Sequence, residues 1–100
     1  MPYADPLTDD ELAAALAGLP EWTREGVVLR RSVKVPGFGE AADLVRAVAV
    51  VANATDHHPD IHITDYRNVA FVLTTHAAGA ITRRDIDLAA EIDRLILARP

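Results

Sequence analysis

The sequence contains no cysteine, one serine and only five aromatic residues among its 100. Without cysteine, the protein has no disulfide bridge, thiolate nucleophile or zinc–thiolate site, and a reducing compartment such as the cytoplasm is expected. The serine, Ser32, falls inside an expected strand, which disfavours a Ser/His/Asp hydrolase. The first residues are acidic and lack the basic-then-apolar pattern of a secretion signal.

Length and charge narrow the class of protein further. Half of the residues are apolar, which suffices for one domain spanning residues 1–100 with a small aliphatic core. No apolar run approaches the roughly 20 residues that cross a bilayer, so no membrane partner is expected. The formal charge of −5 disfavours nucleic acid as a ligand, and the basic cluster of Arg30, Arg31 and Lys34 is interpreted as the solvated side of a strand.

Two segments carry the same helix-start pattern. Thr8 with Glu11 and Thr82 with Asp85 each form a predicted capping box, followed by apolar residues at helical spacing. A third helix is expected over residues 40–54, where the apolar surface is wider than one core-facing stripe requires. That helix is therefore expected to be buried on two sides, which favours at least a homodimer.

Strands are expected between these helices. One lies around Trp22, the second covers residues 27–35 and alternates except at Arg31, the third holds Ile61 and Ile63, and the fourth spans residues 69–73. The resulting order α-β-β-α-β-β-α predicts an α+β fold with a four-stranded antiparallel sheet.

All four histidines, His57, His58, His62 and His76, fall within residues 57–76. Neighbouring histidines on an extended chain point apart and no zinc spacing is present, so a metal site is disfavoured. Proton transfer to a bound small molecule requires only that imidazoles line a pocket with carboxylates nearby. Asp56 and Asp85 could supply those carboxylates, and solvated side chains are the alternative interpretation.

The run from Asn53 to Asp85 resembles the signature of the pterin-4a-carbinolamine dehydratases. In that signature three residues separate a charged residue from His-His-Pro, and an aromatic residue, a histidine and an aspartate follow at set intervals. The matching residues here are His57, His58, Pro59, Tyr66, His76 and Asp85. Asn53 departs from the pattern because it stands where the family has a charge, and Ala80 replaces an expected turn glycine. Tyr66 is interpreted as a packing residue.

The resemblance implies three helices on one face of the sheet, assembly as a dimer or tetramer, and a reaction without metal or redox cofactor. In that reaction 4a-hydroxytetrahydropterin loses water to give quinonoid dihydropterin during tetrahydropterin recycling. The resemblance assigns proton transfer to His57 and His76. It assigns to His58 the holding of the pterin and help for the leaving oxygen. Asp56, Asp85 and Asn53 would support them. An alternative is a weak or inactive member that serves as a dimerisation or assembly partner of another protein.

Overall fold

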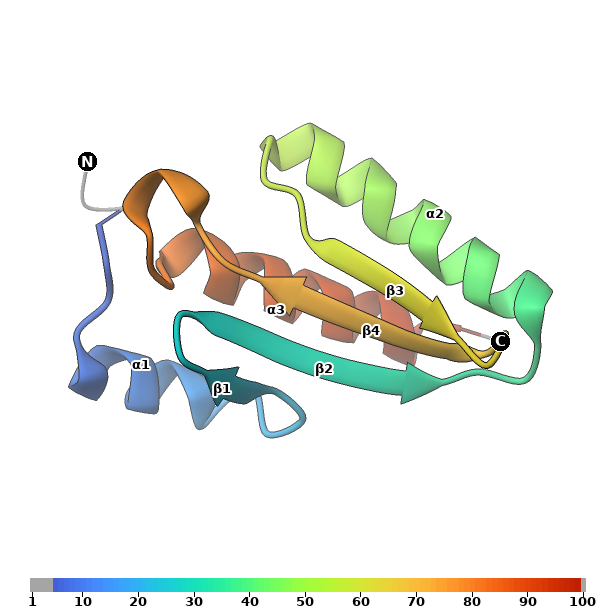
Figure 1. The fold of residues 1–100 in the computed structure, drawn as a ribbon, viewed down its shortest axis with the longest axis horizontal. Coiled ribbons are helices and arrows are strands. Elements are labelled where there is room, and N and C mark those ends of the chain that lie inside the picture. Colours follow the sequence, from blue (N-terminus) through green and yellow to red (C-terminus); the bar gives the residue numbers. More distant parts are fainter. Residues whose placement is uncertain (1–4, 100) are drawn as a thin grey trace.

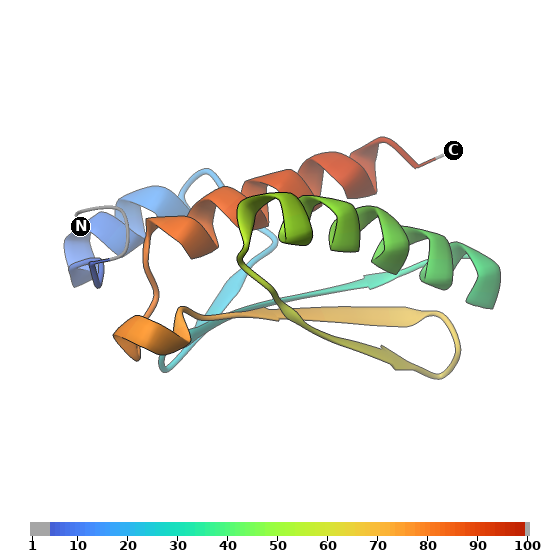
Figure 2. The same ribbon diagram turned by 90° about the horizontal axis from the view of Figure 1, so that it is seen from above.

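Helices cover one face of an antiparallel sheet in the computed structural model, which describes residues 5–99 (Figures 1 and 2). The order is the expected α-β-β-α-β-β-α, with one additional 3-10 turn before the last helix. The elements are α1 (Asp9–Leu16), β1 (Thr23–Glu25), β2 (Val28–Lys34), α2 (Phe38–Thr55), β3 (Asp60–Thr64), β4 (Asn68–Leu73), η2 (His76–Ala78) and α3 (Arg83–Leu97).

The four strands lie in the order β1-β2-β4-β3, and every neighbouring pair is antiparallel. A three-residue turn joins β3 to β4, and its Asp65 and Tyr66 both have positive φ, at 49° and 53°. Tyr66 is 54 % exposed, and the guanidinium of Arg67 lies 5.5 Å from its ring centroid. The interpretation of Tyr66 as a packing residue is therefore wrong: it occupies an exposed turn.

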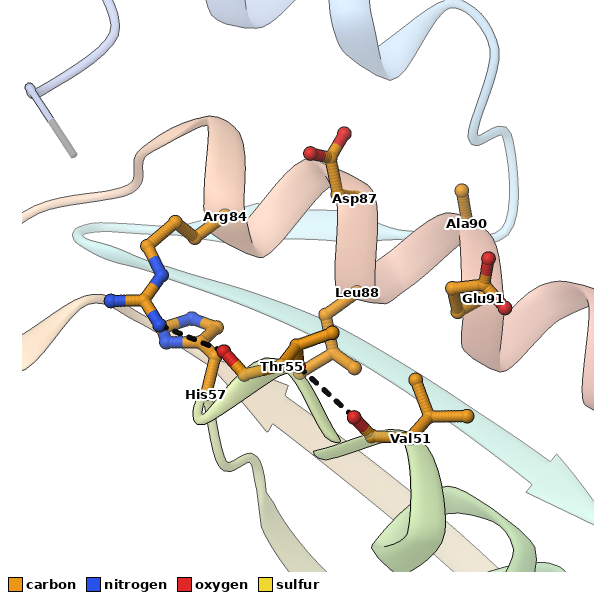
Figure 3. A pocket seen from close by; sticks show the side chains of 8 residues that line it. All are labelled: Val51, Thr55, His57, Arg84, Asp87, Leu88, Ala90 and Glu91. Atoms are coloured by element: carbon orange, nitrogen blue, oxygen red, sulfur yellow. Dashed lines mark hydrogen bonds between the residues drawn. The ribbon is translucent and has the colours of Figure 1, made fainter. Parts of the chain in front are cut away.

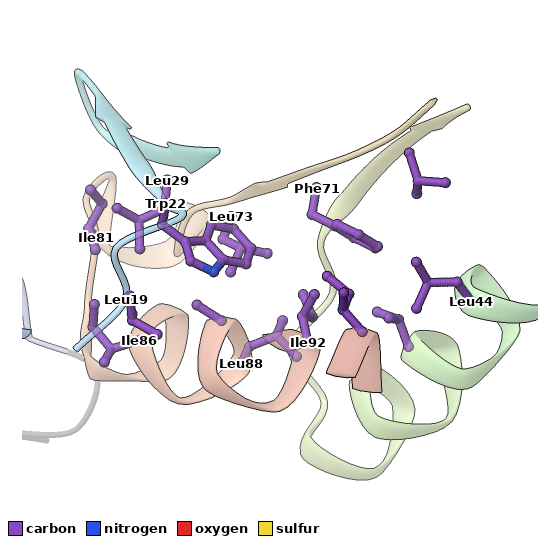
Figure 4. Packing of buried hydrophobic residues seen from close by; sticks show 14 of the residues in the cluster. Leu19, Trp22, Leu29, Leu44, Phe71, Leu73, Ile81, Ile86, Leu88 and Ile92 are labelled. Carbon is purple, nitrogen blue, oxygen red and sulfur yellow. The ribbon is translucent and has the colours of Figure 1, made fainter. Parts of the chain in front are cut away.

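The core lies between the sheet and the helices (Figure 4). Alternate residues of β4 point toward the helices and are fully buried, because successive side chains of a strand point to opposite faces. Trp22 is 5 % exposed and belongs to this core. The buried apolar residues of the strands and α3 are Leu29, Val69, Phe71, Leu73, Ile86, Leu88, Ala89, Ile92 and Ile96.

Arg31 corrects one expectation from the sequence. It shares the helix-facing parity of Leu29, and its side chain is only 15 % exposed, so it is not on the solvated side of β2. Its Nη1 donates to Oδ1 of Asp93 on α3 at 2.5 Å, and the same oxygen accepts from Nε1 of Trp22 at 2.7 Å. The apparent break in the alternation of β2 is thus an ion pair that joins the sheet to α3.

Both expected capping boxes are present, at the starts of α1 and α3. In the first, the Thr8 backbone N–H donates to the Glu11 carboxylate at 2.9 Å. This bond is the larger cause, and a hydrogen bond from the Thr8 side chain the smaller one, of a Glu11 pKa below its usual 4.5. The ionised Glu11 therefore stabilises the folded state fully above pH 4.5, and this stabilisation is lost as the pH falls through the lowered pKa. The second box is buried and belongs to the site described below.

Helix α2 buries one face and leaves the other open. Its inward side chains are Ala41, Leu44, Val48 and Ala52, whereas Val50 on the outer face is 67 % exposed. The expected burial on two sides is therefore not provided within residues 5–99 of this chain. No helix among these residues is long and apolar enough to cross a membrane.

Replacing Asp93 with alanine is expected to lower the free energy of unfolding by about 2 kcal/mol, since Arg31 and Trp22 would each lose the acceptor of a half-buried donor. The matched control is Glu91→Ala, which removes an exposed ion pair with Arg94 on the same helix and should change stability by less than about 0.5 kcal/mol. Urea unfolding of both variants measures the difference. Equal losses would contradict the structural role of Asp93.

Candidate active site

The carboxylate of Asp85 lies at the centre of the candidate site. It is fully buried, with 0 % of its surface exposed, and its Oδ1 lies 2.6 Å from Nε2 of His57. His57 follows the end of α2 and is itself buried, with 9 % exposure. Asp85 is also the third residue of α3, and its Oδ2 accepts from the Thr82 N–H at 2.9 Å. The same side chain therefore caps α3 and orients an imidazole.

Two threonines complete the surroundings of this carboxylate. The hydroxyl of Thr75 donates to Asp85 Oδ2 at 2.8 Å and lies 2.7 Å from the hydroxyl of Thr82. Both threonines are buried. Sequence reasoning missed Thr75 as a site residue, although it follows Leu73 at the spacing of two that marks core-facing positions.

His58 turns away from its neighbour, as expected for adjacent residues on an extended chain. Its Nε2 lies 3.0 Å from Oδ1 of Asn53, in the last turn of α2, and this pair is exposed. The two imidazoles therefore have different partners, a buried carboxylate for His57 and a surface amide for His58. Asn53 is thus in contact with the imidazole of His58.

His76 begins the 3-10 turn η2 directly after the buried Thr75. Its side chain is exposed and makes no hydrogen bond to any of residues 5–99. Because Thr75 and His57 both bond to Asp85, the segments that carry His57 and His76 meet at this carboxylate. The loop that carries His57 and His58 therefore lies near the end of β4.

Asp56 occupies the turn between α2 and His57. Its backbone is left-handed, with φ 51° and ψ 42°, a conformation that aspartate tolerates better than most residues. Its carbonyl oxygen accepts from Nη2 of Arg84 at 2.8 Å, and the carbonyl of Thr55 accepts from the same atom at 3.1 Å. Asp56 therefore shapes the corner through its backbone, and its carboxylate makes no hydrogen bond or ion pair with a histidine within residues 5–99.

A cavity of about 420 Å³ opens between α2 and α3 beside His57 (Figure 3). His57 and Arg84 line one end of it, and Val51, Thr55 and Leu88 are among the other lining residues. His58 and His76 do not line this cavity. Within the described chain, no group of three or more histidine and carboxylate side chains has an arrangement that could hold a metal ion.

A family model for pterin 4 alpha carbinolamine dehydratase matches residues 5–95 of the chain. The chain belongs to this family. The resemblance seen in the sequence is thereby confirmed, and with it the assignment to a family of hydro-lyases.

Named relatives support the same assignment. A protein of Mycobacteroides abscessus is 54 % identical over 90 residues, which cover 90 % of this chain and 95 % of the relative. One of Mycolicibacterium smegmatis is 51 % identical over the same shares of both chains, and both carry the name "Putative pterin-4-alpha-carbinolamine dehydratase".

Solved structures match the fold. A crystal structure described as a transcriptional coactivator/pterin dehydratase from Brucella melitensis has a TM-score of 0.85 at 29 % identity, over 91 % of this chain and 98 % of that one. A pterin dehydratase-like RuBisCO assembly factor shares the fold, with a TM-score of 0.60 at 17 % identity over 74 % and 84 % of the two chains.

The signature residues of the dehydratase family do not all gather in one place. His57, Asp85 and the segment before His76 meet at one end of the sheet, whereas Tyr66 lies in the β3–β4 turn at the other end (Figure 1). Tyr66 therefore lies outside the cluster formed by His57, Thr75, Thr82 and Asp85 in its own chain. Through this cluster Asp85 contacts the three segments that connect α2 to β3, β4 to η2, and η2 to α3.

Replacing Asp85 with alanine is expected to lower the free energy of unfolding by about 3 kcal/mol or more. The buried donors of Thr82 and Thr75 would lose their acceptor, and His57 would lose its buried partner. Glu11→Ala is the matched control, since Glu11 holds the same capping-box position at the exposed start of α1. It should cost far less, because this box lies at the exposed start of α1. Similar losses in thermal or urea unfolding would show that Asp85 acts only as a cap.

Proposed function

We propose that the protein dehydrates 4a-hydroxytetrahydropterin to quinonoid dihydropterin by histidine acid/base catalysis. One group protonates the 4a-hydroxyl, so that the C–O bond breaks and water leaves. Another group takes the proton from the ring nitrogen, whose electron pair forms the new C=N bond. The His57–Asp85 pair at 2.6 Å carries this proposal, because it supplies an imidazole fixed in one orientation.

The contacts of Asp85 favour a base role for His57. The proposal assigns the proton between the two groups to Nε2 of His57, because an ionised carboxylate only accepts hydrogen bonds. In a neutral imidazole this leaves the lone pair on Nδ1, which can take a proton from a substrate. The buried carboxylate then faces the imidazolium that forms, as the aspartate of a catalytic triad does.

His58 and His76 are proposed as the groups around the departing hydroxyl. Both are exposed at the same end of the molecule as His57, and His76 makes no hydrogen bond within residues 5–99 that would compete with a ligand. Either imidazole in its protonated form could donate to the hydroxyl oxygen. The reaction consists of two proton transfers and a C–O cleavage, so it requires no redox cofactor.

We further propose that the protein acts in cytoplasmic tetrahydropterin recycling as a homo-oligomer. The open face of α2, with Val50 at 67 % exposure, and the 61 % exposed Phe38 at the start of the helix support association. A second copy that covered this face would remove apolar surface from water.

His57→Ala and His76→Ala are each expected to lower kcat by roughly 10² or more, the contribution typical of a general acid or base. His62→Ala is the matched control, because His62 is exposed on β3 and lies outside the cluster. The rate is measured spectrophotometrically with enzymatically generated carbinolamine. Parental rates in both variants would show that the site assignment is wrong.

Asn53→Asp is expected to raise kcat/KM at pH 7–8. The substitution replaces the amide oxygen 3.0 Å from His58 Nε2 with a charged one, which favours a protonated imidazole that can act as an acid. Asn53→Ala, which removes the contact, should lower kcat/KM. The charge argument fails if the aspartate variant is no faster than the parent at any pH in this range.

The alternative function is a binding module that has lost its activity. The amide at position 53 is the feature that favours it, because the family signature has a charged residue there. A complete absence of dehydration by the folded parent protein, at every pH tested, would select this alternative over the enzyme.

A further inference from the structure

Arg84 stands at an unusual place for a basic residue. It lies in the first turn of α3, where the helix dipole favours negative charge and disfavours a cation. Its guanidinium does not cap its own helix. Instead, Nη2 donates to the backbone carbonyls of Thr55 at 3.1 Å and of Asp56 at 2.8 Å, both at the end of α2 (Figure 3 shows the first of these bonds).

These two carbonyls would otherwise have no partner in their own helix. The last carbonyls of a helix lack intrahelical donors, and here the N–H groups of Asp56 and His57 already return to Ala52 and Asn53. A cation is also favoured at this end of α2, because the dipole leaves partial negative charge there. Arg84, on the neighbouring helix α3, thus donates hydrogen bonds to the carbonyls at the C-terminus of α2 that lack a partner in α2 itself.

The neighbouring residues Arg84 and Asp85 therefore bind neighbouring residues of the corner that follows α2. Arg84 fixes the backbone of Thr55 and Asp56, and Asp85 fixes the imidazole of His57. Asp56 is left-handed, so the direction in which the chain leaves α2 depends on this one residue keeping its conformation. The positions of His57 and of the following His58 depend on that direction.

We propose that Arg84 is a positioning residue, which clamps the Thr55–Asp56 corner and thereby holds His57 at the angle required for proton transfer. The expected effect on the rate rests on the proposed function. The expected effect on the orientation of the His57 imidazole is independent of it. Loss of the clamp changes the orientation of an imidazole, which can be observed without substrate. A small misplacement of a catalytic group can cost up to roughly 10²-fold in rate.

The test compares Arg84→Ala, Arg84→Lys and the control Arg83→Ala. Arg83 is exposed, precedes Arg84 on α3, and makes no hydrogen bond to any of residues 5–99. Imidazole ¹H–¹⁵N NMR spectra, thermal unfolding, kcat and KM are measured for each variant. In Arg84→Ala, the His57 signals should shift or broaden and kcat should fall roughly 10- to 100-fold, with KM changed less than threefold.

The lysine variant provides the rescue. Its ammonium keeps the charge and can donate to a carbonyl, but lacks the planar fork, so it should recover part of the lost kcat and most of the His57 signal position. If Arg84→Ala fails to fold, Arg84→Gln, which keeps one donor group, takes its place with the same expected direction. Arg83→Ala should match the parent in every measurement.

Three outcomes would overturn the proposal: unchanged His57 signals in the Arg84 variants, a fall in kcat that Arg83→Ala reproduces, or a loss confined to melting temperature. An inactive parent would refute the proposed dehydratase activity instead. In that case the His57 signals still decide whether Arg84 positions the imidazole.

Discussion

The buried carboxylate of Asp85 is the contact on which this end of the molecule depends. It accepts from Thr82, which starts α3, and from Thr75, which ends the connection after β4, and it faces His57 after α2. A carboxylate with no exposed surface requires several donors to offset the loss of hydration. The site and the capping of α3 are therefore one structural unit, and each stabilises the other.

Helix ends explain why the corner is arranged in this way. The carbonyl end of α2 and the N–H end of α3 meet beside His57, with partial charges of opposite sign. Asp85 places its negative charge at the start of α3, and Arg84 brings its positive charge to the end of α2. Each side chain complements a different helix, although both belong to α3.

The sequence predicts this fold well because its strongest signals are local. A capping box spans four residues and strand alternation spans two, so α1, α3, β3 and β4 could be placed without knowing their neighbours. Arg31 was misplaced because the partner that makes its core-facing position stable, Asp93, is 62 residues away. The role of Arg84 is not predictable from local sequence for the same reason, since its acceptors lie 28 and 29 residues earlier. The family signature predicts the candidate site residues, but only the structure shows which of them are in contact.

The adjacent histidines are held with different stiffness. His57 bonds to a buried carboxylate whose other oxygen has two donors, so its orientation is fixed by the core. His58 bonds to an exposed amide, where solvent can replace the partner with little loss of free energy. In the proposed reaction one proton moves from the substrate to the protein and the other from the protein to the substrate. A fixed base, His57, beside an adaptable donor, His58, suits a substrate whose leaving hydroxyl moves as the C–O bond breaks. This difference between the two histidines follows from the local sequence. Pro59 favours an extended backbone at His58, so the two neighbouring imidazoles point apart.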